Sequence, residues 1–533
     1  MTMKDLPHVD ITSLLPERPE ANWPGCTLAI LRGDEVVQTF HHGSASVEHG
    51  VPIGPETNFR IASVTKQFLC AGVVALSDEG KLELDAPLGR YLPELKPAVA
   101  AVTLRQAMSN TSGIRDHFEL FYTAGGGLSV PHRLQASLDI CMAQESTNFE
   151  PGSQYLYSNA NFLLLSKVAE DAAGEPLEAY LDRRFFAPLG MTRTALRPGQ
   201  FDVIPHAATG YVDHGDGILR RGRMTQELWG EGSAWSCVED LVTWLRYCRA
   251  DPDGIIARMR APQVFTTGDL SGYGLGLFVE EWRGQARTGH QGLWPGFRAE
   301  IMYYPEHDIG LVCLSNLSTL EPSALNRQIL AELLGPDLPP RATDIDPALW
   351  TAAETAGPWY DPDSLTLVGF TGGTEDPQLS AYGGQGPLTA LDTTRLAPDV
   401  SRSEIREIDL SQAAQGQIAL VRSSGQIVPL APLSAHAPDL GHDALPGHWY
   451  CPETDAHLHI APKGDGFEVR TPGFRGHDWV TTPIDGGLLK IEELSGPWPR
   501  CFYLHAERSE AGDTILIVNG PRVRRLVYAP LPG

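Results

Sequence analysis

The chain lacks close cysteine pairs. Its eight cysteines are spread singly over 533 residues, and no C-x-x-C motif occurs. Several of them lie within apolar runs, where a buried free thiol is the usual state of the side chain. This pattern predicts neither a disulfide framework nor a zinc site. No nucleotide or haem motif is present either, so we expect no metal and no cofactor.

Positive charge and long apolar runs are also scarce. The chain has 41 Lys and Arg against 66 Asp and Glu, which gives a formal net charge of −25. Nucleic acid and anionic membranes repel an acidic surface, so we expect neither as a partner. Residues 1–8 lack the apolar core of a signal peptide, and no stretch approaches the length of a membrane span. These absences favour a cytoplasmic protein.

The remaining composition, 42% apolar and 20% charged, is that of a globular protein. The length exceeds what one core supports and favours about three domains. A Pro-rich linker begins near residue 335, and we expect domains at 1–335, 346–436 and 440–533.

Strands are predicted at both ends of the first domain, with helices between them. Residues 26–31 and 35–40 flank a Gly-Asp turn and predict a hairpin, while 299–304 and 309–314 predict the last two strands. The economical arrangement is an α/β (α+β) fold, with the hairpin beside the last strands in one antiparallel sheet that helices cover on both faces.

Beyond the linker, short alternating apolar runs predict two small antiparallel β-barrels. A weak repeat supports two units of similar type, because Gly-Pro-Trp-Tyr at 357–360 is echoed by Gly-His-Trp-Tyr at 447–450.

The most informative stretch is Ser63-Val64-Thr65-Lys66 at the start of a predicted apolar helix. Residues three apart share one helical face, so the hydroxyl of Ser63 and the amine of Lys66 are expected to be neighbours. The start of a helix favours a developing negative charge on Ser63, and a desolvated Lys66 can take its proton. Ser-x-x-Lys alone also fits a serine cap followed by a surface lysine.

Two further motifs follow in order. Tyr157-Ser158-Asn159 comes after a Pro-Gly turn and before a predicted helix over 161–171, and His290-Gln291-Gly292 precedes the last two strands. Taken singly, Tyr157 is an ordinary buried tyrosine and His290 an ordinary turn histidine.

Together the three motifs resemble the serine β-lactamase and penicillin-binding family, which has Ser-x-x-Lys, Tyr-x-Asn and a Lys-Thr-Gly strand in this order. The resemblance spans about residues 20–320, and further similar stretches lie at 80–85, 110–113, 150–152, 188–191 and 273–276. It implies a β-lactamase-like domain and a serine-acylating enzyme.

The resemblance also implies roles for single residues. Ser63 would attack a carbonyl carbon and form an acyl-enzyme, and Lys66 and Tyr157 would move the proton, with either as the general base. Asn159 would bind the substrate amide and hold Lys66, and the oxyanion would lie between the backbone N–H groups of Ser63 and Leu293.

His290 stands where most members of the family carry a lysine that holds a substrate carboxylate. Histidine is a weaker and pH-dependent cation, so β-lactam hydrolysis is not the expected activity. The D-aminopeptidases of the family share this change and the plan of a catalytic domain followed by two barrels. The resemblance therefore implies a dimeric, D-stereospecific serine aminopeptidase that releases small N-terminal D-residues such as D-Ala from peptides, amides or esters.

In that subgroup a loop of the last barrel enters the active site and supplies a carboxylate for the substrate amine. Residues 471–488 are the expected loop here, with Asp485 as the first choice for the amine partner and Asp478 as the second, because a buried ammonium needs a charged partner. A plain turn residue is the other interpretation of Asp485.

Two alternatives remain open at this point. The first is an esterase or β-lactamase-like hydrolase on the same fold, which would not require a free amine. The second is a penicillin-binding-type sensor that is acylated but turns over slowly, although the missing export signal and His290 argue against it.

Overall fold

The computed structural model describes residues 6–16, 22–126, 131–339, 344–362, 364, 366–381, 384–398, 405–422, 425–435, 440–471, 479–493 and 500–531. All eight cysteines are buried and free. Within these ranges, no helix has the length and apolar character needed to cross a membrane.

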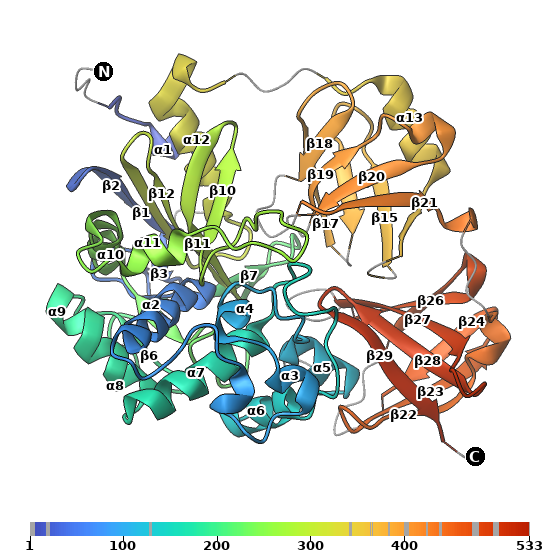
Figure 1. Ribbon diagram of the computed structural model, residues 1–533. Coiled ribbons are helices and arrows are strands. Elements are labelled where there is room, and N and C mark those ends of the chain that lie inside the picture. Colours follow the sequence, from blue (N-terminus) through green and yellow to red (C-terminus); the bar gives the residue numbers. More distant parts are fainter. Residues whose placement is uncertain are drawn as a thin grey trace.

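A six-stranded antiparallel sheet is the centre of the first part of the chain (Figure 1). Its order is β10-β11-β12-β13-β1-β2, so the N-terminal hairpin pairs beside the last strands, as predicted. The bounds are β1 Cys26–Arg32, β2 Glu35–His42, β10 Phe278–Trp282, β11 Gln285–Trp294, β12 Phe297–Tyr304 and β13 Ile309–Ser315.

Helices cover both faces of this sheet because β1 is apolar on both sides. Its residues alternate between two cores: Ala29 and Leu31 join one, and Leu28 and Ile30 join the other. The first core takes most of the helices, including α2 Thr65–Asp78, α4 Leu104–Met108, α5 His117–Thr123, α6 Leu134–Met142, α7 Asn159–Ala173, α8 Leu177–Leu181, α10 Val238–Ala250 and α11 Ile255–Arg260. The second core takes α12 (Pro322–Leu334) and the short α1 (Ile11–Leu14).

The second part of the chain is a closed eight-stranded barrel preceded by a helix, α13 (Pro347–Ala356). Trp350 and Ala353 of this helix are buried in the barrel core. The strands are β14 Trp359–Asp361, β15 Thr366–Thr371, β16 Gln378–Ala381, β17 Gly384–Ala390, β18 Arg395–Pro398, β19 Ile405–Asp409, β20 Ile418–Arg422 and β21 Ile427–Pro432.

The third part is an eight-stranded antiparallel sheet that curls into a nearly closed barrel. Its two edge strands, β24 and β25, meet where the Thr481 hydroxyl donates a hydrogen bond to the carbonyl of Phe467 at 2.5 Å. The strands are β22 Gly447–Cys451, β23 Ala456–Lys463, β24 Gly466–Arg470, β25 Val480–Ile484, β26 Leu488–Glu493, β27 Arg500–Arg508, β28 Thr514–Gly520 and β29 Val523–Pro530. The predicted pair of barrels is thus confirmed.

The repeat seen in the sequence occupies the same place in both barrels. Trp359 faces Pro432 across the β14–β21 pair, and Trp449 faces Pro530 across the β22–β29 pair. Each tryptophan indole N–H donates a hydrogen bond at 2.9 Å to a preceding backbone carbonyl, that of Ala353 or Leu445. The matching registers support the interpretation of the two barrels as repeats of one type.

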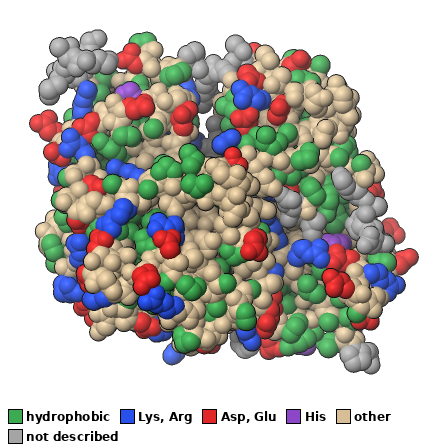
Figure 2. Space-filling model, viewed as in Figure 1, with side chains coloured by type: hydrophobic (Ala, Val, Ile, Leu, Met, Phe, Trp, Pro, Cys, Tyr) green, Lys and Arg blue, Asp and Glu red, His purple; other side chains and the backbone are tan. Residues whose placement is uncertain are grey.

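The two barrels differ in how they join the first part of the chain. The core of the last barrel, which includes Trp449, Phe502 and Tyr528, belongs to the same apolar cluster as α2 and α7. The core of the closed barrel is a separate cluster. Figure 2 shows a narrow gap between the first part of the chain and the closed barrel at the top of the view.

Candidate active site

Ser63 lies where a short strand turns into helix α2. Strand β5 (Phe59–Arg60) is followed by a 3-10 helix, η1 (Ala62–Val64), and α2 begins at Thr65. Ala62 takes a left-handed backbone conformation with φ of 47°. A non-glycine residue pays a strain cost there, and such strain is common at functional sites. The turn leaves Ser63 partly exposed on the wall of a pocket.

Lys66 is fully buried one turn into the helix. Its Nζ lies 3.2 Å from the Ser63 Oγ, 2.9 Å from the Asn159 Oδ1 and 2.6 Å from the backbone carbonyl of Glu231. Asn159 and Glu231 offer only acceptor oxygens, so two N–H groups of Lys66 are directed at them. The remaining substituent direction of the Lys66 nitrogen points at the Ser63 hydroxyl. If Lys66 is an ammonium, it donates a hydrogen bond to this hydroxyl; if it is a neutral amine, its lone pair accepts one.

Asn159 is the first residue of α7, and Asp116 holds it in place. The Asp116 Oδ2 accepts hydrogen bonds from the backbone N–H and the side-chain amide of Asn159, both at 2.8 Å. Its Oδ1 caps α5 by accepting from the backbone N–H of Phe118. Asp116 is fully buried; burial alone would raise its pKa, but Arg522 and the Asn159 N–H outweigh this and hold the pKa below its usual value.

Tyr157 lines the pocket beside Ser63. Its ring lies 5.0 Å from the Lys66 Nζ and 6.2 Å from the His290 ring. The hydroxyl oxygen is buried and has no hydrogen-bond partner within the described ranges. It is therefore free to exchange a proton with a group that enters the pocket.

His290 lies on β11 in an aromatic wall. Its Nε2 is 2.9 Å from the Tyr273 hydroxyl, and its Nδ1 is 2.5 Å from the carbonyl of Gln291, so the Nδ1 carries a proton. The ring packs 4.9 Å from that of Phe278, and the residue is 1% exposed.

Strand β11 passes close to the serine turn because Gly292 has no side chain. A Cβ there would lie 1.9 Å from the carbonyl oxygen of Ile61, so only glycine allows this approach. The next residue, Leu293, lines the same pocket as Ser63. The structure thus brings six of the seven predicted site residues together: Ser63, Lys66, Tyr157, Asn159, His290 and Leu293.

Asp485, the seventh, lies elsewhere. It is exposed in the turn between β25 and β26 (485–487), which packs against the segment that links the two barrels, and it is not among the pocket-lining residues. The expectation that Asp485 reaches the site rested on the resemblance, in which a loop of the last barrel supplies a carboxylate. Here the turn that holds Asp485 faces the other barrel. Asp478, the second choice, lies outside the described residues, as does most of the expected loop 471–488.

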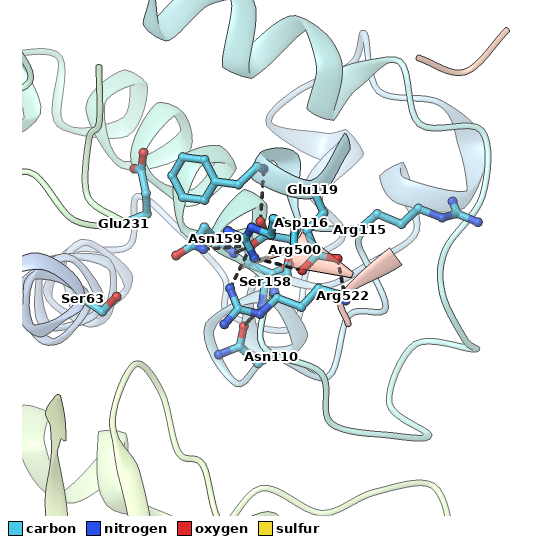
Figure 3. A network of polar contacts seen from close by, with 12 residues as sticks. Ser63, Asn110, Arg115, Asp116, Glu119, Ser158, Asn159, Glu231, Arg500 and Arg522 are labelled. Carbon is cyan, nitrogen blue, oxygen red and sulfur yellow. Dashed lines mark hydrogen bonds and ion pairs between the residues drawn. The ribbon is translucent and has the colours of Figure 1, made fainter. Parts of the chain in front are cut away.

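The last barrel does reach the pocket, but through other residues. Arg500, at the start of β27, and Arg522, in the β28–β29 turn, both line the pocket. The Arg522 guanidinium stacks over the Tyr157 ring at 5.0 Å. The same side chain lies near Asp116 (Figure 3). The backbone N–H of Arg522 donates to the Glu119 Oε2 at 2.7 Å, and its carbonyl accepts from the Asn148 side chain at 3.0 Å.

Glu119 is fully buried under these two arginines. Its Oε1 lies 3.6 Å from an Arg500 nitrogen, and Asp116 lies 3.7 Å from an Arg522 nitrogen. Burial raises the pKa of Glu119 to about 7, against the opposing effect of Arg500 and Arg522. Sequence reasoning missed Asp116, Glu119, Arg500 and Arg522. Only the Asp-x-Phe helix cap at Asp116 leaves a local signal.

Glu231 is an acidic side chain in the pocket lining. It is 2% exposed, its Oε2 accepts from the backbone N–H of Trp229 at 2.9 Å, and burial raises its pKa to about 7.

Comparison with known proteins agrees with this geometry. A protein-family profile described as Beta-lactamase matches residues 11–335. The chain belongs to the beta-lactamase family. The match covers the whole six-stranded sheet and each of the three motifs.

Relatives that match over nearly the full length are named D-aminopeptidase. The one from Brucella canis is 27% identical over 95% of this chain and 96% of its own, and the one from Brucella anthropi is 28% identical over 92% of each. A solved octameric penicillin-binding protein homologue from Pyrococcus abyssi has the same fold, with a TM-score of 0.53 and 19% identity over 95% of this chain and 96% of its own.

Proposed function

We propose that this protein is a serine hydrolase that removes a small N-terminal D-residue from peptides, amides or esters through an acyl-enzyme on Ser63. The observation that carries the proposal is the contact of 3.2 Å between the Ser63 Oγ and a fully buried Lys66 Nζ at the wall of an open pocket. The full-length relatives named D-aminopeptidase support the choice of substrate.

The surroundings of Lys66 suit a general base. A neutral amine has two N–H groups and one lone pair. Its two N–H groups would be held by the Asn159 Oδ1 and the Glu231 carbonyl, which leaves the lone pair facing the Ser63 hydroxyl. Tyr157 is the other candidate, because its hydroxyl lacks a described partner and can deliver a proton to the leaving group.

After attack, the carbonyl oxygen of the substrate becomes an oxyanion. In this proposal the backbone N–H groups of Ser63 and Leu293 stabilise it, because Gly292 lets β11 pass beside the serine turn. Water then hydrolyses the ester on Ser63, with the same proton carriers working in reverse.

The buried position of His290 argues against a β-lactamase-like activity. A lysine at this place would present a cation to a substrate carboxylate, whereas His290 is bound by Tyr273 and by the Gln291 carbonyl. Its aromatic neighbours instead form an apolar wall that suits a short side chain.

Hydrolysis of D-alanine p-nitroanilide, compared with its L-isomer and its N-acetylated form, tests the proposal. We expect turnover of the free D-form and little or none of the other two. Equal turnover of the acetylated form would identify a general amidase or esterase instead. Equal turnover of the D- and L-isomers would show that the enzyme is not stereospecific.

A further inference from the structure

The last barrel places two guanidinium groups in the lining of the serine pocket. Arg500 and Arg522 come from different strand ends of this barrel, and both side chains are largely buried, with 14% and 27% of their surface exposed. Burying a cation is costly unless a partner compensates it, so two cations at one wall of a substrate pocket need an explanation.

Arg500 is the less well paired of the two with respect to its printed neighbours. The Glu119 Oε1 lies 3.6 Å from an Arg500 nitrogen, which is longer than a hydrogen bond. The Nε of Arg500 is buried and has no hydrogen-bond partner in the described part of the chain. The Oδ2 of Asp116 also accepts two hydrogen bonds from Asn159.

The balance of basic and acidic side chains at this wall favours the binding of an anion. Arg500 and Arg522 face the acidic groups Glu119 and Asp116, while Lys66 lies beside the buried Glu231. Glu119 favours its neutral form more than an exposed glutamate does, because burial raises its pKa. A substrate carboxylate would bring a negative charge to this wall and an acceptor for the Arg500 Nε.

The wall lies at the Asn159 end of the pocket. Asp116 contacts both Asn159 and Arg522, and the Arg522 side chain covers Tyr157. In Figure 3, Arg522 lies beside Asn159, and Ser63 lies across from both.

We propose that Arg500 and Arg522 form an anion subsite and that the preferred substrates of this enzyme carry a carboxylate close to the scissile bond. The inference rests on the proposed function, because it adds a negative charge to the proposed substrate. The charge would be on the D-residue itself or on the residue that follows it in the peptide. A D-aspartyl-type residue would place the carboxylate on the acyl side, and a free C-terminal residue would place it on the leaving side.

Pairs of substrates that differ in one charge test the subsite. D-aspartic acid α-p-nitroanilide is compared with the D-asparagine anilide for the acyl side, and D-alanyl-glycine with D-alanyl-glycinamide for the leaving side. For one of the two pairs we expect kcat/KM of the acid to exceed that of the amide by roughly 10- to 100-fold, the usual range for a charge-assisted hydrogen bond. Equal rates within both pairs would overturn the inference.

Arg522→Gln should lower kcat/KM of the acid substrate much more than that of the amide and so abolish this preference, and Arg522→Lys should retain part of it. The backbone contacts that anchor the turn do not involve the side chain, so the fold is expected to survive. Arg500→Gln is the second variant. Arg525→Gln is the matched control, because Arg525 is an exposed arginine near the same turn that pairs with Glu507. An equal loss with acid and amide in the Arg522 variant would show a structural role and contradict the proposal.

A binding assay separates this inference from the proposed function. A neutral fluorophosphonate labels the serine nucleophile, and succinate, compared with succinamide, is the protecting ligand. If no D-substrate is turned over but succinate alone slows labelling, the subsite stands and the proposed function fails. If D-alanine anilide is hydrolysed while acid and amide protect equally, the proposed function stands and the subsite fails.

Discussion

Asp116 couples Lys66, the proposed general base, to the last barrel through one carboxylate. It holds both nitrogens of Asn159, whose side-chain oxygen holds Lys66, and it pairs with Arg522 of the β28–β29 turn. Its effect on the chemistry is therefore indirect, through the orientation of Asn159 and the field at Lys66.

Asp116→Asn should lower kcat by roughly 100-fold, because a displacement of about 1 Å in a catalytic group costs this much. The amide cannot accept from Asn159 with the same strength and leaves Arg522 without its charge partner. The pH profile of kcat should shift as well, since a negative charge near Lys66 is lost.

Asp346→Asn is the control for that experiment. Asp346 caps α13 with the same kind of side-chain bond that Asp116 makes at α5, but it lies on the closed barrel. If both variants lose a little stability and neither changes kcat or its pH profile, Asp116 serves only as a helix cap.

Glu119 gives the protein a pH-dependent stability. Burial raises its pKa from 4.5 to about 7, with Asp116 acting in the same direction and Arg500 and Arg522 against it. Between these pH values the folded protein holds a proton that the unfolded chain has released, so the free energy of unfolding falls as the pH rises through this window.

Glu119→Gln removes this ionisation and keeps an acceptor for the Arg522 N–H. We expect the variant to gain stability relative to the parent protein between pH 5 and pH 8 in urea unfolding. Glu150→Gln, at an exposed position, is the control. If the free energy of unfolding depends on pH in the same way in the parent and in Glu119→Gln, Glu119 does not have the raised pKa.

At the scale of elements, the site depends on the close approach of β11 to the serine turn. Gly292 permits it, and a methyl group there would collide with the backbone of Ile61. The strand would have to move away from Ser63, and Leu293 would move with it.

Gly292→Ala should therefore lower kcat by about 100-fold, the cost of removing one oxyanion donor. Gly54→Ala is the control, because nothing lies within 4 Å of the added methyl group. The kcat values and thermal midpoints of both variants are compared with the parent protein. A Gly292→Ala enzyme with the kcat of the control would show that Leu293 is not part of the oxyanion site.

The elements also show what the sequence can and cannot predict. The hairpin, α2 and the barrel strands follow from local periodicity, and Ser63 and Lys66 follow from spacing within one helix turn. The contact between Arg522 and Glu119 joins residues 403 positions apart, and no local pattern encodes it. For the same reason, the turn at Asp485 had the right composition but the wrong place in the fold.

At the scale of the whole molecule, the two barrels are joined differently to the first part of the chain. The closed barrel has a core of its own and contacts the last barrel through a small cluster that includes Leu367 and Leu433. The last barrel shares its apolar core with the catalytic helices, and Arg115 ties the two by hydrogen bonds to Glu453 and to the backbone of Arg524. The Arg115 side chain is 2% exposed, so water has little access to this contact.

This architecture predicts two unfolding transitions. Catalytic helices and β22–β29 should lose protection together in urea, while α13 and β14–β21 unfold separately, because their core is distinct. Hydrogen exchange followed by mass spectrometry along a urea series resolves the peptides of each part. Loss of protection in β22–β29 at a lower urea concentration than in α2 and α7 would contradict a shared unit.

The most direct test of the account is the covalent intermediate. The protein is mixed with a D-alanine ester, quenched in acid within a turnover and digested, and the peptide that carries the added acyl mass is sequenced by mass spectrometry. We predict an alanyl group on Ser63 with the D-ester, none with the L-ester, and none with the Ser63→Ala variant. A D-alanyl group on another residue, or turnover by the Ser63→Ala variant, would contradict the account.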